Sequence, residues 1–126
     1  MKFTQTNDAP SAIGPYSQAI TVANIVYTSG QIALTSNGGD EILSQGVKEQ
    51  TTQVLANLQA VLVASGSDKS KVIKANIFLA DMEHFAIVNE IYANFFQDHK
   101  PARSTVCVRT LPKDALIEID AIAISD

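Results

Sequence analysis

Residues Leu116 to Ile124 read LIEIDAIAI, and this stretch restricts the possible folds more than any other. In a β-strand, successive side chains point to opposite faces. One face of this strand is entirely apolar, and it consists of Ile117, Ile119, Ala121 and Ala123. The other face is apolar at its ends but acidic in the middle, at Glu118 and Asp120. A sheet with one solvated face alternates polar and apolar residues cleanly, so we expect both faces of this strand to be covered.

A long amphipathic helix is predicted from about Ser44 to Ala64. Its apolar side recurs with helical spacing at Val47, Thr51, Val54, Leu55, Leu58, Val61 and Leu62. Ser44 is suited to cap its start, and Gly66 can end it in the left-handed conformation.

A second helix is predicted to begin after Asp81, which can cap it, and to end near Asp98-His99. Pro101 disfavours helical backbone at Lys100. The buried side of this helix is expected to contain Phe85, Val88, Tyr92 and either Phe95 or Phe96.

The other regular segments have the composition of β-strands. Residues 19–22 and 25–28 predict a hairpin around Ala23-Asn24, and residues 31–34 predict a further short strand. Residues 72–79 and 103–108 predict two more strands. Residues 8–17 are rich in Pro, Gly and Ser, which is typical of a loop.

The resulting order, β-β-β-α-β-α-β-β, predicts an α+β fold with two helices on one face of a mostly antiparallel sheet. Two helices can cover only one face. The apolar character of both faces of residues 116–124 therefore predicts that another subunit covers the second face, and that the protein is an oligomer.

Length and composition favour one globular domain spanning residues 1–126. The chain is 46% hydrophobic and 17% charged, and its length is sufficient for a single core. It has no apolar run long enough for a transmembrane helix, and its N-terminus lacks the apolar core of a signal peptide. The single cysteine, Cys107, excludes an internal disulfide and is typical of a reducing compartment. We therefore expect a cytoplasmic protein.

The charge pattern argues against nucleic-acid binding. The net charge is −4, with nine Lys and Arg against thirteen Asp and Glu. The basic residues are scattered, whereas nucleic-acid binders need a basic face to neutralise phosphates.

No metal or cofactor motif stands out. His84 and His99 lack Cys or carboxylate partners at ligand spacing. Cys107 has no neighbouring His to make a thiolate, so we expect a buried structural thiol. No Walker or dinucleotide-binding glycine loop is present. The sequence predicts neither a metal nor an organic cofactor.

Arg103 and Glu118 are the strongest candidates for chemistry, because each is a charged residue in an apolar β-segment. Neighbouring strands could bring them together. They could form a cross-strand salt bridge, or Arg103 could lie at a solvated strand end. Alternatively, the forked guanidinium could bind a substrate carboxylate while Glu118 handles a proton.

Two further residues could belong to the same site. Tyr16 could donate its hydroxyl from the Gly14–Ser17 loop, or its ring could cover the sheet edge. Asn89 could contact a ligand, or it could bond a nearby loop.

The chain resembles the Rid family, also called YjgF-type proteins or reactive intermediate deaminases. Five motifs, spread in order over almost the whole chain, carry this resemblance: AIGPYSQA at 12–19, TSGQI at 28–32, FAIVN at 85–89, PARSTV at 101–106, and LPKD at 111–114 followed by IEI at 117–119.

The resemblance implies a chorismate-mutase-like fold and a homotrimer with active sites in the clefts between subunits. It also implies hydrolysis of imine or enamine acids, such as 2-iminopropanoate and 2-iminobutanoate, to 2-keto acids and ammonia. No cofactor is implied, and the small-molecule substrate and the other subunits are the only expected partners.

The resemblance also implies roles for individual residues. Arg103 matches the arginine that clamps the substrate carboxylate, and Glu118 matches the acid that positions or activates water. Tyr16 matches a tyrosine lining the cleft. The remaining matches are substrate-binding positions: Ser29, Gly30, Asn89 and Thr105.

This sequence departs from the common family pattern in two places. Thr105 stands where Cys is frequent, and Cys107 should not inherit that role. The link from Phe96 to Pro101 is short, with Lys100 where an aromatic residue often precedes the proline. Both changes could alter the pocket.

Three other functions are compatible with parts of the sequence. A non-catalytic protein could use the same cleft to bind a small carboxylic acid. A ribonuclease or translation inhibitor is opposed by the acidic charge and by the lack of a histidine acid–base pair. A chaperone-like protein would act independently of Arg103.

Overall fold

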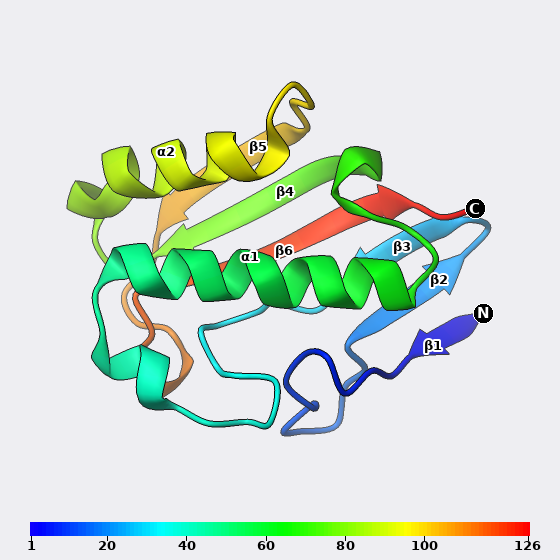
Figure 1. Ribbon diagram of the computed structural model, residues 1–126, viewed down its shortest axis with the longest axis horizontal. Helices are drawn as coiled ribbons and strands as arrows, with labels where there is room; N and C mark the ends of the chain where they lie inside the picture. Colours follow the sequence, from blue (N-terminus) through cyan, green and yellow to red (C-terminus); the bar gives the residue numbers. More distant parts are fainter.

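The protein is described here by a computed structural model covering residues 1–126. One sheet contains all six strands in the order β1-β2-β3-β6-β4-β5 (Figure 1). The pair β4 and β5 is parallel, and all other neighbours are antiparallel. The strands are β1 (Lys2–Thr4), β2 (Ala19–Val22), β3 (Ile25–Thr28), β4 (Val72–Leu79), β5 (Ala102–Cys107) and β6 (Ile117–Ile124).

Two α-helices, α1 (Val47–Ala64) and α2 (Phe85–Phe96), lie across one face of this sheet (Figure 1). Short 3₁₀ turns occur at Glu41–Ser44, Lys69–Lys71, Met82–His84 and Pro112–Asp114. The architecture confirms the predicted two helices on one face of a mixed, mostly antiparallel sheet. Neither α-helix has the length and apolar content needed to cross a bilayer.

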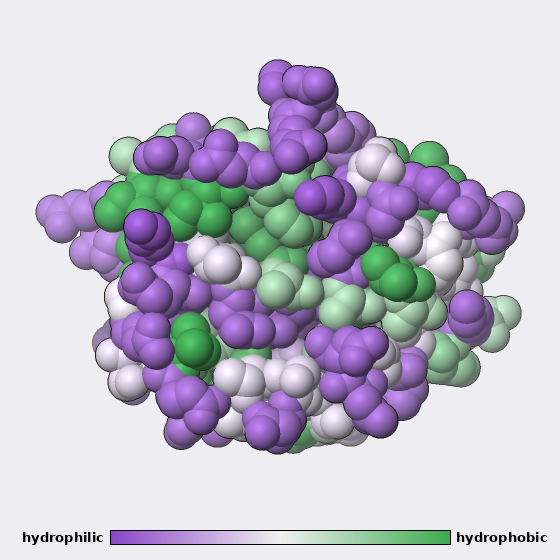
Figure 2. All heavy atoms as spheres, in the orientation of Figure 1, coloured by the Kyte–Doolittle hydropathy of each residue, from purple (hydrophilic) through white to green (hydrophobic).

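The hydrophobic core lies between the helices and the sheet. The predicted apolar side of α1 is buried, as are Val88, Tyr92 and Phe96 of α2. The apolar face of β6 meets them, and all four of its residues are at most 2% exposed: Ile117, Ile119, Ala121 and Ala123. The outward side of the helix layer is mainly hydrophilic (Figure 2).

The opposite face of the sheet, called the open face below, carries no helix. Strand register places these apolar residues on it: Phe3, Ile20, Val22, Ile25, Tyr27, Phe78, Val106, Ile122 and Ile124. Several are strongly exposed, including Phe3 at 63%, Tyr27 at 49% and Val106 at 46%. The chain itself therefore leaves the second face of β6 uncovered.

Two local predictions are confirmed by backbone geometry. Ala23 and Asn24 both have positive φ, 50° and 65°, as a tight β-hairpin turn requires. Gly66 adopts φ +79° just after α1. The predicted cap of the second helix lies one turn early: the carboxylate of Asp81 accepts from the Glu83 N–H at 2.9 Å and caps the 3₁₀ turn Met82–His84, whereas α2 starts after His84 without a side-chain cap.

The predicted strand at residues 31–34 is wrong. Only Gln31 forms a bridge, with Ile119. The side chain of Asn57 on α1 donates to the carbonyls of Ile32 and Leu34, at 3.2 and 2.8 Å. A side chain thus satisfies backbone groups that a neighbouring strand would otherwise bind.

The predicted cap of α1 is also wrong. The Ser44 hydroxyl donates to the carbonyl of Glu41 at 2.8 Å within the preceding 3₁₀ turn, and the helix begins after Gly46. At the other end of the helix layer, α2 stops at Phe96, slightly before the predicted end, because Gln97 has a positive φ of 56°. Strand β1 was not predicted, since three residues are too few to show alternation.

Candidate active site

One cavity, of about 450 Å³, opens beside β6 where the N-terminal loop meets the segment after β3. It brings together four of the predicted site residues, Tyr16, Ser29, Gly30 and Glu118, and adds Asp120. We call this cavity the Glu118 cavity.

Glu118 lies on the open face, in the same row as Phe78 of β4 and Val106 of β5. Its carboxyl packs against Gly30 so closely that a Cβ at position 30 would lie 2.7 Å from the Glu118 Cδ. Partial burial raises the pKa of Glu118, and the nearby charge of Asp120 raises it further. Because of the close contact with Gly30, position 30 must be glycine for the Glu118 carboxyl to keep its place.

Ser29 holds the loop rather than offering its hydroxyl to the cavity. Its Oγ donates to the carbonyl of Ser17 at 2.5 Å, and its N–H donates to the carbonyl of Gln18 at 2.9 Å. The N–H of Gly30, by contrast, takes part in none of the backbone hydrogen bonds. The backbone of Gly30 is thus the better candidate for contact with a ligand.

Gln18 fixes the loop that carries Tyr16, and sequence reasoning missed it. Its side chain is 1% exposed. It accepts from the Thr6 N–H at 2.7 Å and donates to the carbonyls of Thr6 and Pro10 at 3.1 and 2.9 Å. A glutamine at the start of a strand gives no sign of this role, because the bonds depend on how the preceding loop folds back.

Gln18→Ala is expected to lower the free energy of unfolding by about 1–3 kcal/mol, because it leaves buried backbone groups of the loop unpaired. Chemical denaturation followed by circular dichroism measures the change. Gln45→Ala, at an exposed position before α1, is the control and should have little effect. Equal unfolding midpoints for the two variants would show that the loop does not depend on Gln18.

Arg103 lies on the edge strand β5, in the row of Ala75, and extends beneath α2. Its Nη1 donates to Asn89 Oδ1 at 2.7 Å, and its Cζ lies 4.9 Å from the ring centre of Tyr92 and 5.6 Å from that of Phe85. The only ion pair of the structure joins Lys71 and Asp126. The salt-bridge alternative for Arg103 is therefore wrong.

Arg103 borders a second cavity, of about 310 Å³, which we call the Arg103 cavity. None of its lining residues is acidic; they include Asn89, Tyr92, His99, Lys100 and Pro101. Burial raises the pKa of the Tyr92 hydroxyl, and the charge of Arg103 partly offsets that effect. A fixed cation without an acidic partner is suited to bind an anion.

Thr105 and Cys107 follow Arg103 on the same strand. The Thr105 hydroxyl is buried and has no hydrogen-bond partner. Cys107 is exposed, so the prediction of a buried thiol is wrong. Its place near the end of the edge strand, where no further strand covers it, explains the exposure.

The structure does not bring Arg103 and Glu118 together. Strand β4 separates their strands, and the β4 partners of the two residues, Ala75 and Phe78, lie three positions apart. The two Cα atoms are therefore separated by about 10 Å across the sheet and about 10 Å along it. Arg103 also points to the helix side, while Glu118 points to the open face, so the prediction that neighbouring strands bring them within reach is wrong for one chain.

The predicted site residues thus form two groups. Arg103 and Asn89 line one cavity, with Thr105 beside them on β5, and the remaining four line the other. No cluster of three or more His, Cys, Asp or Glu side chains is placed to hold a metal ion. The Arg103 cavity contains a cation suited to bind a carboxylate, and the Glu118 cavity contains a carboxyl suited to transfer a proton.

Comparison with known proteins gives consistent matches over nearly the whole chain. The family model described as Endoribonuclease L-PSP matches residues 6–125. A RutC family protein of Pyrococcus horikoshii is 50% identical over 118 residues, covering 94% of this chain and 93% of that protein. The 2-iminobutanoate/2-iminopropanoate deaminase of Mus musculus is 45% identical over 123 residues, covering 98% of this chain and 90% of the deaminase.

A solved structure agrees with the fold. The crystal structure of E. coli TdcF with bound serine superimposes with a TM-score of 0.92 at 39% identity, and the match covers 100% of both chains. Together with the family model and the two relatives, this confirms the resemblance seen in the sequence motifs. The chain belongs to the Endoribonuclease L-PSP family, which is the Rid family of YjgF-type proteins.

Proposed function

We propose that this protein is a 2-iminobutanoate/2-iminopropanoate deaminase that works as a single-domain homotrimer with a chorismate-mutase-like arrangement. The observation that carries the proposal is Arg103, a cation with no acidic partner, held against two aromatic rings and Asn89. An imino acid offers the carboxylate that such a guanidinium binds. The deaminase name of the mouse relative and the serine bound to TdcF support a small amino-acid-like ligand.

The separation of the two cavities supports active sites shared between subunits. In one chain, Arg103 and Glu118 belong to opposite faces of the sheet. A neighbouring subunit packed on the open face can place its own Arg103 edge near the Glu118 cavity. Each site would then take its cation from one subunit and its carboxyl from the next.

The open face supports the trimer. An exposed apolar patch on a sheet is a typical interaction surface. The open face has such residues on β1, β2, β3 and the end of β6, and it has Phe78 and Val106 in the row of Glu118. Three copies related by a three-fold axis would bury this patch in a closed ring.

In the proposed reaction, Arg103 binds the substrate carboxylate and so fixes the position of the neighbouring C2 carbon. A water oxygen attacks C2 of the protonated imine (C=NH2⁺), the π electrons of the C=N bond move to nitrogen, and Glu118 transfers a proton from the water to that nitrogen. The C–N bond then breaks, the hydroxyl proton passes to the departing ammonia, and a 2-keto acid and ammonium are released. The N–H of Gly30 is free to bind a substrate or water oxygen at this step.

The basic test is a coupled assay. Threonine dehydratase generates 2-iminobutanoate, and the purified protein should speed its disappearance in proportion to the amount added. A correctly assembled protein that leaves the decay rate unchanged would contradict the proposed activity.

Mixing two inactive variants tests whether the site is shared. Arg103→Ala and Glu118→Gln are each expected to lose most of the activity when expressed alone. In a cyclic trimer that contains both variants, one of the three sites combines an intact arginine with an intact carboxyl, so the isolated mixed trimers should recover about a third of wild-type activity. Co-expression with two different affinity tags isolates the mixed trimers.

The double variant Arg103→Ala/Glu118→Gln, co-expressed with Arg103→Ala, is the control, because none of its mixtures contains an intact arginine. Mixed trimers confirmed by native mass spectrometry that stay inactive would show that the site is not divided between subunits in this way.

A second candidate is a protein that binds small carboxylic acids without turning them over. The serine bound to TdcF favours it. Ligand binding that disappears with Arg103→Ala, in a protein that does not accelerate imine loss, would support this function instead. Calorimetry with serine and with 2-ketobutanoate provides the measurement.

A further inference from the structure

The open face of β6 carries two acidic residues that point into the same cavity. Glu118 and Asp120 are separated by one residue and both line the Glu118 cavity. Alternate residues of a strand lie about 7 Å apart on one face. The family resemblance gives a role to Glu118 alone, and Asp120 has none in the proposed reaction described above.

Asp120 is fixed by a neighbour on β4. Asn76 stands directly across from it in the strand register, and its Nδ2 donates to Asp120 Oδ1 at 2.7 Å. The nearest cation on the same face of β4 is Lys74, whose Nζ bonds the hydroxyl of Ser104 at 3.0 Å. No Lys or Arg is paired with Asp120, because the only ion pair is Lys71–Asp126.

The negative charge of Asp120 acts on the pKa of Glu118. Besides the two acids, Tyr16 from the loop is the only titratable residue lining the cavity. Tyr27 of β3 and Lys74 of β4 share the open face farther along the strands. Lys113 and Asp114, which follow Pro112 at the rim, are exposed. Burial raises the pKa of Glu118, and of the charged neighbours Asp120 is the one that raises it further.

We propose that Asp120, held in place by Asn76 and directed into the same cavity as Glu118, is a positioning residue whose charge acts on the reaction through the Glu118 carboxyl. This inference rests on the proposed deaminase function for its catalytic meaning, but the interaction itself does not depend on it. A carboxyl that gains and loses its proton near the working pH is efficient both in taking a proton from water and in giving one to nitrogen. Asp120 supplies the charge and Asn76 supplies its position.

The test is a direct titration of the Glu118 carboxyl by NMR in protein labelled with ¹³C at glutamate side chains. The resonance is assigned by its loss in Glu118→Gln. Asp120→Asn removes the charge and keeps the shape, and Asp120→Ser is a second neutral replacement should the first fail to fold. In both, the titration midpoint of Glu118 is expected to move to lower pH than in the wild type, because the repelling charge is gone.

Two further variants separate charge from shape. Asp120→Glu keeps the charge and should leave the midpoint near that of the wild type. Glu49→Gln removes an equal charge from the exposed side of α1 and should leave it unchanged. A Glu118 midpoint that stays at its wild-type value in both neutral variants would overturn the proposal, as would an equal shift in Glu49→Gln.

The same variants are then assayed for imine hydrolysis across pH. Whichever limb of the kcat/KM profile belongs to Glu118 should move to lower pH in Asp120→Asn. A shifted midpoint in a protein without deaminase activity would confirm the coupling and reject the proposed function. A shifted midpoint in an active enzyme whose pH profile does not move would show that Asp120 has no role in catalysis.

Discussion

Arg103→Ala is expected to lower kcat/KM for 2-iminobutanoate by roughly 30- to 1000-fold, which corresponds to the loss of a charge-assisted, two-point contact worth about 2–4 kcal/mol. The reason lies in the surroundings of the guanidinium. It is held by Asn89 and by the faces of Tyr92 and Phe85, and no carboxylate of the chain neutralises it. A substrate carboxylate is therefore the charge partner that it lacks.

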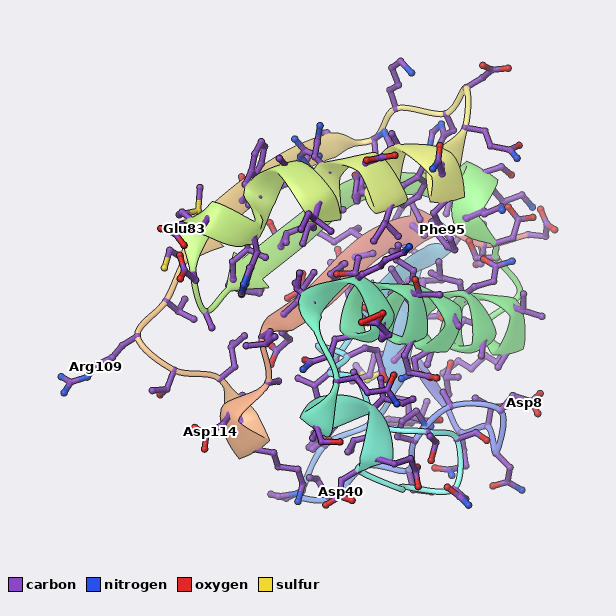
Figure 3. The ribbon with its side chains drawn as sticks, turned by 60° about the vertical axis from the view of Figure 1, so that its left-hand side comes forward. Asp8, Asp40, Glu83, Phe95, Arg109 and Asp114 are labelled. Atoms are coloured by element: carbon purple, nitrogen blue, oxygen red, sulfur yellow. The ribbon has the colours of Figure 1, made fainter.

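Two replacements sharpen this experiment. Arg103→Lys keeps the charge but loses the planar fork, so it should restore only part of the activity. Arg109→Ala removes an arginine on the linker after β5 that points away from the rest of the molecule (Figure 3), and it should leave kcat/KM unchanged. The assay is the dehydratase-coupled decay of the imine, with size-exclusion chromatography to show that assembly is intact.

If the Arg103→Ala protein kept wild-type kcat/KM with its assembly unchanged, Arg103 would not be the group that binds the substrate carboxylate. If activity were lost together with the assembly, the arginine would instead have a structural role at the interface. The chromatography decides between these outcomes.

Tyr27→Asp is expected to dissociate the protein into monomers and to abolish the deaminase activity. Tyr27 lies on the open face between Ile20 and Ile122, and it is 49% exposed in the single chain. An exposed aspartate at this position should change the folding stability of a monomer only slightly. Within an apolar interface, however, an unpaired carboxylate loses its hydration without compensation, which costs several kcal/mol in each of the contacts.

Val63→Asp is the matched control. Val63 lies on α1 and is 56% exposed, so in this variant too an aspartate replaces an exposed apolar side chain, but on the helix side of the molecule. Analytical ultracentrifugation at micromolar concentration should find the control assembled as the wild type is and the Tyr27 variant monomeric. A Tyr27→Asp protein that still sediments as a trimer would mean that the open face is not the interface.

Much of the fold could be predicted because its signals are local. The hairpin depends on two adjacent residues with positive φ, Ala23 and Asn24, and the helices depend on spacing within a single segment. The apolar face of β6 was predicted as core from alternation alone, and its residues are buried.

The errors concern polar side chains whose hydrogen-bond partners the sequence does not specify. Residues 31–34 have the composition of a strand, but the side chain of Asn57 binds two of their carbonyls. Ser44 has the chemistry of a helix cap, but the carbonyl of Glu41 already binds its hydroxyl. In both places a polar side chain found a partner that sequence spacing does not specify.

The candidate site, too, could be predicted only in part from the sequence. The residue types at the site came from motifs, and the structure groups them into two cavities. Their separation could not be predicted, because strand order inserts β4 between β5 and β6, and because register sets which face each side chain takes. In the sequence Asp120 stands out only as part of an acidic pair, and its bond with Asn76 depends on that same register.

The placement of Arg103 and Glu118 on opposite faces of one sheet has a genetic consequence under the proposed trimer. Each subunit would contribute its arginine to one site and its carboxyl to a different one. In a cell that makes an intact and a defective copy of the chain, one subunit lacking both residues would disable two of the three sites in any trimer that it joins. Such an allele would act dominantly, and its effect would exceed that of simply losing one copy of the gene.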